Sequence, residues 1–226
     1  MKSPKTTPVA PRMIVPMISA EHGSAFTFAA MGVPVPHLAY HGGPLLTSVQ
    51  VVTIFWGAAW NQSAQASLIP QINHFFDFIV TSSLMDVLAE YSVPGKTIGH
   101  GSRIGTATIT TSEPGGGTGT VSDAQIQQAL QGWIGAGTVP PQTANTLYFV
   151  YLPPGVLSTM GGQASCQQYC GYHNHIGGSI FYAVEPFITC VGCSFGQIFN
   201  SLTKVSSHEL CEAITDAALN AWFDFR

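Results

Sequence analysis

Apolar and polar positions along the chain predict strands that alternate with helices. Residues 45–56 are largely apolar at both alternating sets of positions, which is typical of a strand buried on both faces of a sheet. In residues 67–91 the apolar positions recur at helical spacing, with Pro70 suited to the first turn and Pro94 after the end. A strand followed by a helix therefore opens the folded part of the chain.

Similar patterns predict the remaining elements. Ser122 and Gln125 match a capping box, which indicates the start of a helix. Further strands are expected at residues 97–111 and 145–152 and near 180–184, and further helices from Ser122 through Trp133 and from Ser201 past Glu212. Strands that alternate with helices indicate an α/β or α+β fold, built as a single layered domain.

The start of the chain differs from the rest. Residues 1–38 are rich in proline and lack periodicity, which predicts an extended arm before a domain of residues 39–226. Basic residues suit the start of a secretory signal, but the apolar helix that should follow is interrupted at Pro8, Pro11 and Pro16. A signal that has been removed, a different gene start and another export route all fit this pattern.

Composition excludes two classes of function. Charged residues make up 8% of the chain, Lys and Arg together number 7, and the net charge is −4. Binding to nucleic acid needs a stripe of basic side chains, and the sequence has none. No apolar run reaches the length of a membrane span, so none is expected. A surface of Ser, Thr, Asn, Gln and Gly is common in exported proteins.

The five cysteines fall into two close pairs and a fifth residue, at Cys166, Cys170, Cys190, Cys193 and Cys211. The pairs suit two disulfides in an oxidising compartment. They also approach the spacing of a four-thiolate zinc site, although C-x3-C followed by C-x2-C is imperfect for it. The low charge favours disulfides, with Cys211 left over.

The last predicted helix carries the main candidate for chemistry. At about 100° per residue, Glu212 lies about 40° from His208, one turn along the same face. Glu209 falls on the flank of that face. An apolar stripe lies opposite, formed by Leu202, Leu210, Ala213, Ile214 and Ala217.

Ligands at i and i+4 on a helix can hold one metal ion, as in the H-E-x-x-H motif. Here Glu212 replaces the second histidine, a carboxylate can bind Zn²⁺, and Glu209 stands where the general base would be. A helix with this motif beside a mixed sheet is the arrangement of zincin peptidases. The alternative is a solvated polar face. Four of the chain's 11 acidic residues lie within 209–226, which favours a bound counter-charge.

Three residues are candidates for completing such a site. His173 and His175 would lie on one face if their segment is a strand, and such a pair often binds metal. Hydrogen-bonded loop histidines are the alternative. Asp216 lies one further turn along the helix face of Glu212. His41 and His100 each stand beside glycine, and we interpret them as structural.

Three ordered stretches together resemble the phosphate-induced protein 1 (EXORDIUM-like) family. They are residues 40–46 with the strand that ends at Trp56, the C-x3-C-G-aromatic-H pattern of residues 166–173, and H-E-L-x-E at 208–212 followed by N-A-W-F at 220–223. Residues 208–216 also match H-E-x-x-E-A-x-T-D of bacterial relatives. The chain departs from the family at Cys190 and Cys193, which the family spaces as C-x3-C, and in ending at Arg226, which suggests a shortened C-terminus.

The resemblance implies an extracellular or cell-wall location and oxidised cysteine pairs, but it brings no settled enzymatic activity. We therefore carry two hypotheses. The first is a secreted metal-dependent hydrolase, a zincin-like peptidase that uses Zn²⁺ and acts on peptides. The second is a non-catalytic extracellular protein, in which the same residues form a structural metal or polar site and the surface contacts a cell-wall polymer or another protein.

Overall fold

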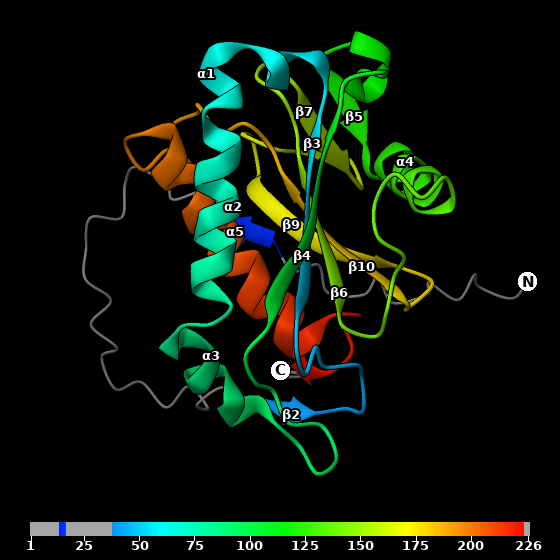
Figure 1. The fold of residues 1–226 in the computed structure, drawn as a ribbon, viewed down its shortest axis with the longest axis vertical. Helices are drawn as coiled ribbons and strands as arrows, with labels where there is room; N and C mark the ends of the chain where they lie inside the picture. The colour runs from blue at the N-terminus through cyan, green and yellow to red at the C-terminus, as the bar shows by residue number, and fades with distance from the viewer. Residues whose placement is uncertain (1–13, 17–37, 224–226) are drawn as a thin grey trace, which may run out of the picture.

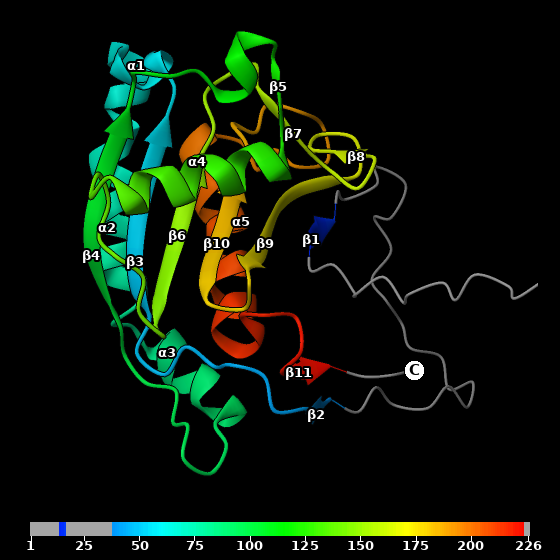
Figure 2. The same ribbon diagram turned by 90° about the vertical axis from the view of Figure 1, so that its right-hand side faces the viewer.

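The computed structural model describes residues 14–16 and 38–223. Within these residues, one mixed sheet of six strands has the order β1-β9-β10-β6-β3-β4, which Figure 2 shows face-on. Its strands are β1 (Ile14–Pro16), β3 (Gln50–Trp56), β4 (Ser102–Ile109), β6 (Thr146–Tyr151), β9 (Tyr169–Ile176) and β10 (Ile180–Glu185). Strands β4, β3, β6 and β10 are parallel, while β9 and β1 are added antiparallel at one side.

Helices cover both faces of this sheet, so the domain has three layers (Figure 1). One face is covered by α2 (Leu68–Ile79), α3 (Ser83–Leu88) and α5 (Ile198–Asp216), and the other by α4 (Asp123–Gly135). Strand β3 shows why helices are needed on both faces of the sheet. Val51 and Phe55 point into the core below α2 and α5, whereas Val52 and Ile54 point into the core below α4. The predicted strand buried on both faces is confirmed, as is the layered α/β class.

Short elements complete the described part of the chain. A three-stranded sheet consists of β5 (Thr120–Ser122), β7 (Leu157–Met160) and β8 (Gln163–Ala164), and a two-stranded one of β2 (Ala39–Tyr40) and β11 (Trp222–Phe223). The remaining turns of helix are η1 (Ala58–Asn61), α1 (Ser63–Ala66), η2 (Ala89–Tyr91) and η3 (Pro114–Gly117). No helix among the described residues is long and apolar enough to cross a membrane.

Two predicted elements differ from the structure. The single helix expected at residues 67–91 is broken between α2 and α3, because the Thr81 and Ser82 hydroxyls bond back to carbonyls of α2 and Ser82 caps α3. The sequence also predicts loops in the cysteine-rich region before the strand near residues 180–184, but the structure has strand β9 there, so that His173 and His175 lie on a strand, one of the two alternatives for them. Most of the predicted N-terminal arm, residues 1–13 and 17–37, lies outside the described residues, as does Asp224.

Two disulfides, Cys166–Cys190 and Cys170–Cys193, link β9 and the turn before it to the loop that enters α5. The prediction that the cysteine pairs form disulfides and not a zinc site is therefore confirmed, and Cys211 on α5 keeps a free thiol. Each bridge closes a loop of 23 or 24 residues. Cross-links of this length stabilise a fold by about 3 kcal/mol each, mainly by restricting the unfolded chain.

We expect the variant Cys170→Ala/Cys193→Ala to lose about 3 kcal/mol of unfolding free energy, measured by urea denaturation. Cys211→Ala, which removes a thiol outside the disulfides, is the matched control and should lose no more than about 1 kcal/mol. Equal losses in the two variants would contradict a stabilising role for the bridge.

Candidate metal centre

Helix α5 lies against β9 because a glycine permits close approach. A Cβ atom placed on Gly171 would lie 2.5 Å from Cγ1 of Val205 and 3.1 Å from the carbonyl oxygen of Val184. His173 lies two residues after Gly171, on the same face of the strand. Glu209 lies one helical turn after Val205. The Gly171–Val205 contact therefore brings His173 and Glu209 together.

The apolar stripe predicted for this helix is buried, as at Leu202, Leu210 and Ala213. Glu209, predicted on the flank between the apolar stripe and the polar face, has a fully buried side chain. Strand β9 packs over this flank, which the sequence did not reveal.

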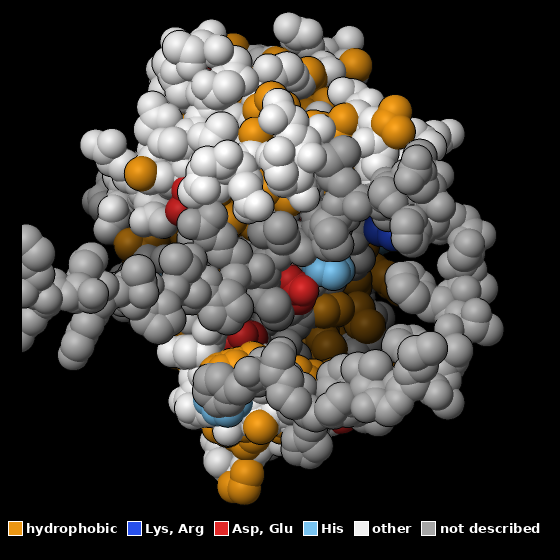
Figure 3. Space-filling model, turned by 180° about the vertical axis from the view of Figure 1, so that it is seen from behind, with side chains coloured by type: hydrophobic (Ala, Val, Ile, Leu, Met, Phe, Trp, Pro, Cys, Tyr) orange, Lys and Arg blue, Asp and Glu red, His pale blue; other side chains and the backbone are white. Residues whose placement is uncertain are grey.

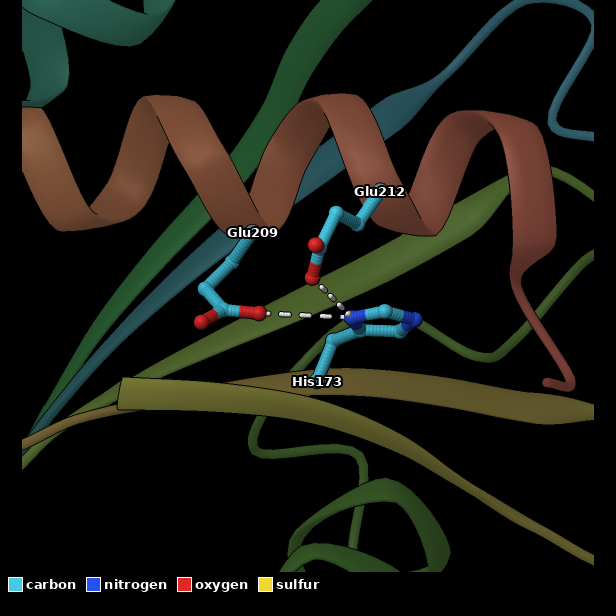
Figure 4. A group of neighbouring side chains, drawn as sticks. All are labelled: His173, Glu209 and Glu212. Atoms are coloured by element: carbon cyan, nitrogen blue, oxygen red, sulfur yellow. Dashed lines mark hydrogen bonds and ion pairs between the residues drawn. The ribbon is translucent and has the colours of Figure 1, made fainter. Parts of the chain in front are cut away.

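His173 is the centre of the cluster (Figure 4). Its side chain is 1% exposed, and its Nδ1 lies 3.2 Å from Oε2 of Glu209 and 3.5 Å from Oε2 of Glu212. The other ring nitrogen, Nε2, lies 3.3 Å from the carbonyl oxygen of Asp216. One imidazole from the strand thus contacts three residues that follow one another along the helix.

Glu212 connects the buried cluster to the surface. Its Oε1 lies 2.9 Å from Nε2 of His208, whose side chain is 42% exposed. Both residues line a hollow of about 440 Å³ whose other walls are Leu84, Phe195, Lys204, Ser207 and Cys211. Figure 3 shows this face hollowed over an apolar floor, with His, acidic and basic side chains gathered at its rim.

A further buried acid lies close to Glu209. Glu185, the last residue of β10, is fully buried, and its two carboxylate oxygens have no hydrogen-bond partner among the described residues. Burial and the charge of Glu209 raise the pKa of Glu185 well above its ordinary value. Sequence reasoning missed Glu185, although an acid that ends an otherwise apolar strand was a possible signal.

The charges of these groups are strongly coupled. Burial by itself lowers the pKa of His173, but Glu209 and Glu212 outweigh it and raise the pKa to about 9. Burial raises the pKa of Glu209 despite the contact with His173. Burial also acts to raise the pKa of Glu212, but the two neighbouring histidines lower it below its ordinary value. In this geometry His173 is the imidazolium that balances the carboxylates.

Three residues can hold a metal ion together. His173, Glu209 and Glu212 each offer one ligand atom, and these atoms lie within 4.8 Å of one another. Bonds of about 2.1 Å separate ligand atoms by about 3.5 Å, so small side-chain rotations suffice. His173 Nε2 contacts the carbonyl oxygen of Asp216, and a hydrogen bond of this kind orients the ring of a metal-binding histidine. Oε1 of Glu209 is buried without a hydrogen-bond partner in the described structure, and Oε2 of Glu212 is buried with its 3.5 Å ion-pair contact to His173, which also suits a cation.

The structure brings only some of the metal-binding candidates predicted from the sequence into one group. His208 contacts Glu212 but lies outside the group of three, while Glu209 lies within it. The carboxylate of Asp216 accepts hydrogen bonds from the backbone amides of residues 220 and 221 and so shapes the turn after α5. His175 accepts a hydrogen bond from the amide of Gly178 in the β9–β10 hairpin.

Comparison of the chain with protein-family models, with curated proteins and with solved structures finds no match in any of the three. The resemblance to the phosphate-induced protein 1 family stays a prediction. The chemistry of the centre therefore has to be argued from its geometry.

We expect Gly171→Ala to cost about 1–3 kcal/mol of unfolding free energy, because the added methyl group overlaps Val205. Gly132→Ala is the control, since a Cβ there meets nothing within 4 Å in helix α4, and alanine favours a helix. Urea unfolding measures both. A loss at Gly132 equal to that at Gly171 would contradict the close-approach argument.

The pH dependence of stability follows from the raised pKa of His173. Its stabilising charge is fully present below the unfolded pKa of 6.5 and is lost as the pH rises through about 9. In chelator-treated protein, the free-energy difference between wild type and His173→Gln should shrink between pH 7 and pH 10. The expected slope is up to about 1.4 kcal/mol per pH unit. A difference that stays constant over this range would contradict the assignment.

Proposed function

We propose that this protein is an exported metal-dependent hydrolase that cleaves peptides, with a zinc ion held by His173, Glu209 and Glu212. The observation that carries the proposal is a group of one imidazole and two carboxylates, in which Oε1 of Glu209 is buried without a hydrogen-bond partner among the described residues and Glu212 lines an open hollow. Zinc in such a site supplies a Lewis acid and lowers the pKa of a water molecule.

The charge of the cluster supports a cation. Glu209 and Glu212 place two carboxyl groups beside one histidine, the buried Glu185 interacts electrostatically with Glu209, and no Lys or Arg forms an ion pair with them in the described residues. Buried charges are costly unless they are paired or bind metal. A divalent ion would replace the proton that His173 otherwise carries.

The position of Glu212 supports catalysis over a purely structural site. Catalytic zinc sites use three protein ligands and leave one position open, whereas structural sites are closed by four. Glu212 and Cys211 also line a second hollow of about 240 Å³, next to Leu88 and Trp222. Both hollows are lined by Cys211 and Glu212, and their largely apolar walls suit the side chains of a peptide better than a sugar polymer.

His208 is placed for proton transfer. It is half-exposed at the hollow, and its Nε2 contacts the free side of Glu212. We propose that it moves a proton between a water molecule and the leaving amine. In the H-E-x-x-H pattern this role belongs to the residue at the position of Glu209. Here Glu209 is buried against His173, which favours a ligand role.

The disulfides support the proposed location. Bridges persist in oxidising compartments, and both cysteine pairs of this chain are bridged. Together with the resemblance to the phosphate-induced protein 1 family, they favour an extracellular or cell-wall site of action.

One observation favours a non-catalytic alternative. His173 is 1% exposed and already paired with Glu209, so the cluster can serve as a structural polar or metal site without turnover. In that case the exported protein would contact a cell-wall polymer or another protein through its surface.

Metal analysis of protein purified without chelator tests the proposal. We expect about one zinc per chain, and loss of zinc in His173→Gln and Glu209→Gln. His208→Gln should keep the zinc and lose peptide hydrolysis by at least about 100-fold. Glu113→Gln is the control, because Glu113 is exposed and only accepts a hydrogen bond from the amide of Ala58.

Each other result has a definite meaning. Absence of stoichiometric zinc from the untreated protein overturns the proposal. Zinc without hydrolysis of any member of a peptide library favours the structural alternative. If Glu209→Gln keeps zinc but loses hydrolysis, Glu209 is the base and His208 the ligand, as the sequence pattern suggests.

A further inference from the structure

A short N-terminal strand lies at the sheet edge beside the candidate centre. Strand β1 pairs antiparallel with β9, with Ile14 opposite Tyr172 and Pro16 opposite Tyr169. The next residue along β9 after Tyr172 is His173. Strand β1 also contacts α5, the other element of the centre, and Figure 2 shows it outside β9.

Three features make the pairing between β1 and β9 weak. It spans three residues, its register shifts between Ile14 and Pro16, and proline has no amide hydrogen to donate. An edge strand offers backbone donors and acceptors to any extended segment, whatever its side chains. A second extended peptide can therefore compete with β1 for this edge.

The edge continues into a cavity beyond the end of β1. A hollow of about 460 Å³ is lined by the second half of β9, including His173, Asn174 and His175, and by Asp123 at the start of α4. An extended segment on β9 thus runs from the position of β1 past His173 and beside this hollow.

We infer that the outer edge of β9 binds an extended peptide, and that Ile14–Pro16 is an internal occupant that holds the protein in a self-inhibited form. The ligand is a segment that adds to the sheet through its backbone, as β1 does. The inhibition half rests on the proposed hydrolase function, whereas the peptide-binding half does not.

The test compares the full-length chain with a full-length variant that carries Ile14→Gly, Val15→Gly and Pro16→Gly, since glycine weakens a strand. The probe is a labelled synthetic peptide with the sequence of residues 10–20, followed by fluorescence anisotropy. A matched peptide with N-methylated amides at positions 14 and 15 keeps its side chains but loses two backbone donors. Near-UV circular dichroism checks that the variant keeps its fold.

We expect the probe to bind the glycine variant at least about tenfold more tightly than wild type, because the edge is no longer occupied. The N-methylated peptide should bind neither. Peptide hydrolysis should rise by a similar factor at unchanged zinc content. Equal binding of the probe to both proteins, or equal binding of the N-methylated peptide, overturns the inference. Tighter binding without hydrolysis in either protein upholds the edge site and removes both the hydrolase function and the inhibition.

Discussion

The packing of helix α5 against strand β9 is the contact on which the candidate centre depends. Gly171 lets the backbone of β9 approach Val205 more closely than any side chain would allow. This contact sets the register in which His173 meets Glu209 and then Glu212. The disulfides reinforce it, because they join the start of β9 to the loop that enters the helix. Structural support and candidate chemistry therefore share the same two elements.

Burial of acidic side chains is the second constraint. Glu209 and Glu212 contact His173, the buried Glu185 interacts with Glu209, and the proton of His173 offsets the cost of desolvating these groups only in part. A protein with 8% charged residues places several of its few acids at one point in the core. Such a concentration costs stability in the empty cluster and supplies affinity when a cation binds. That balance is the physical basis of the proposed metal dependence.

The predicted chemistry was partly visible in the chain. The helical spacing that puts His208 and Glu212 on one face is a local property, and the structure keeps it with a contact of 2.9 Å. The role of Glu209 could not be read from the helix alone. Whether that residue faces solvent, a ligand or the core depends on the strand that covers it, and the sequence left open whether the segment of His173 and His175 is a strand or a loop.

The sequence by itself determined a single layered domain of the α/β or α+β class, the strand buried on both faces and the amphipathic last helix, because each follows from hydrophobic periodicity along a short segment. It also favoured disulfides without choosing their partners. Only the tertiary structure decided that Cys170 pairs with Cys193, that His173 joins Glu209 and Glu212, and that β1 lies on the edge of β9. These are contacts between segments distant in the chain, and local spacing carries no information about which of them meet.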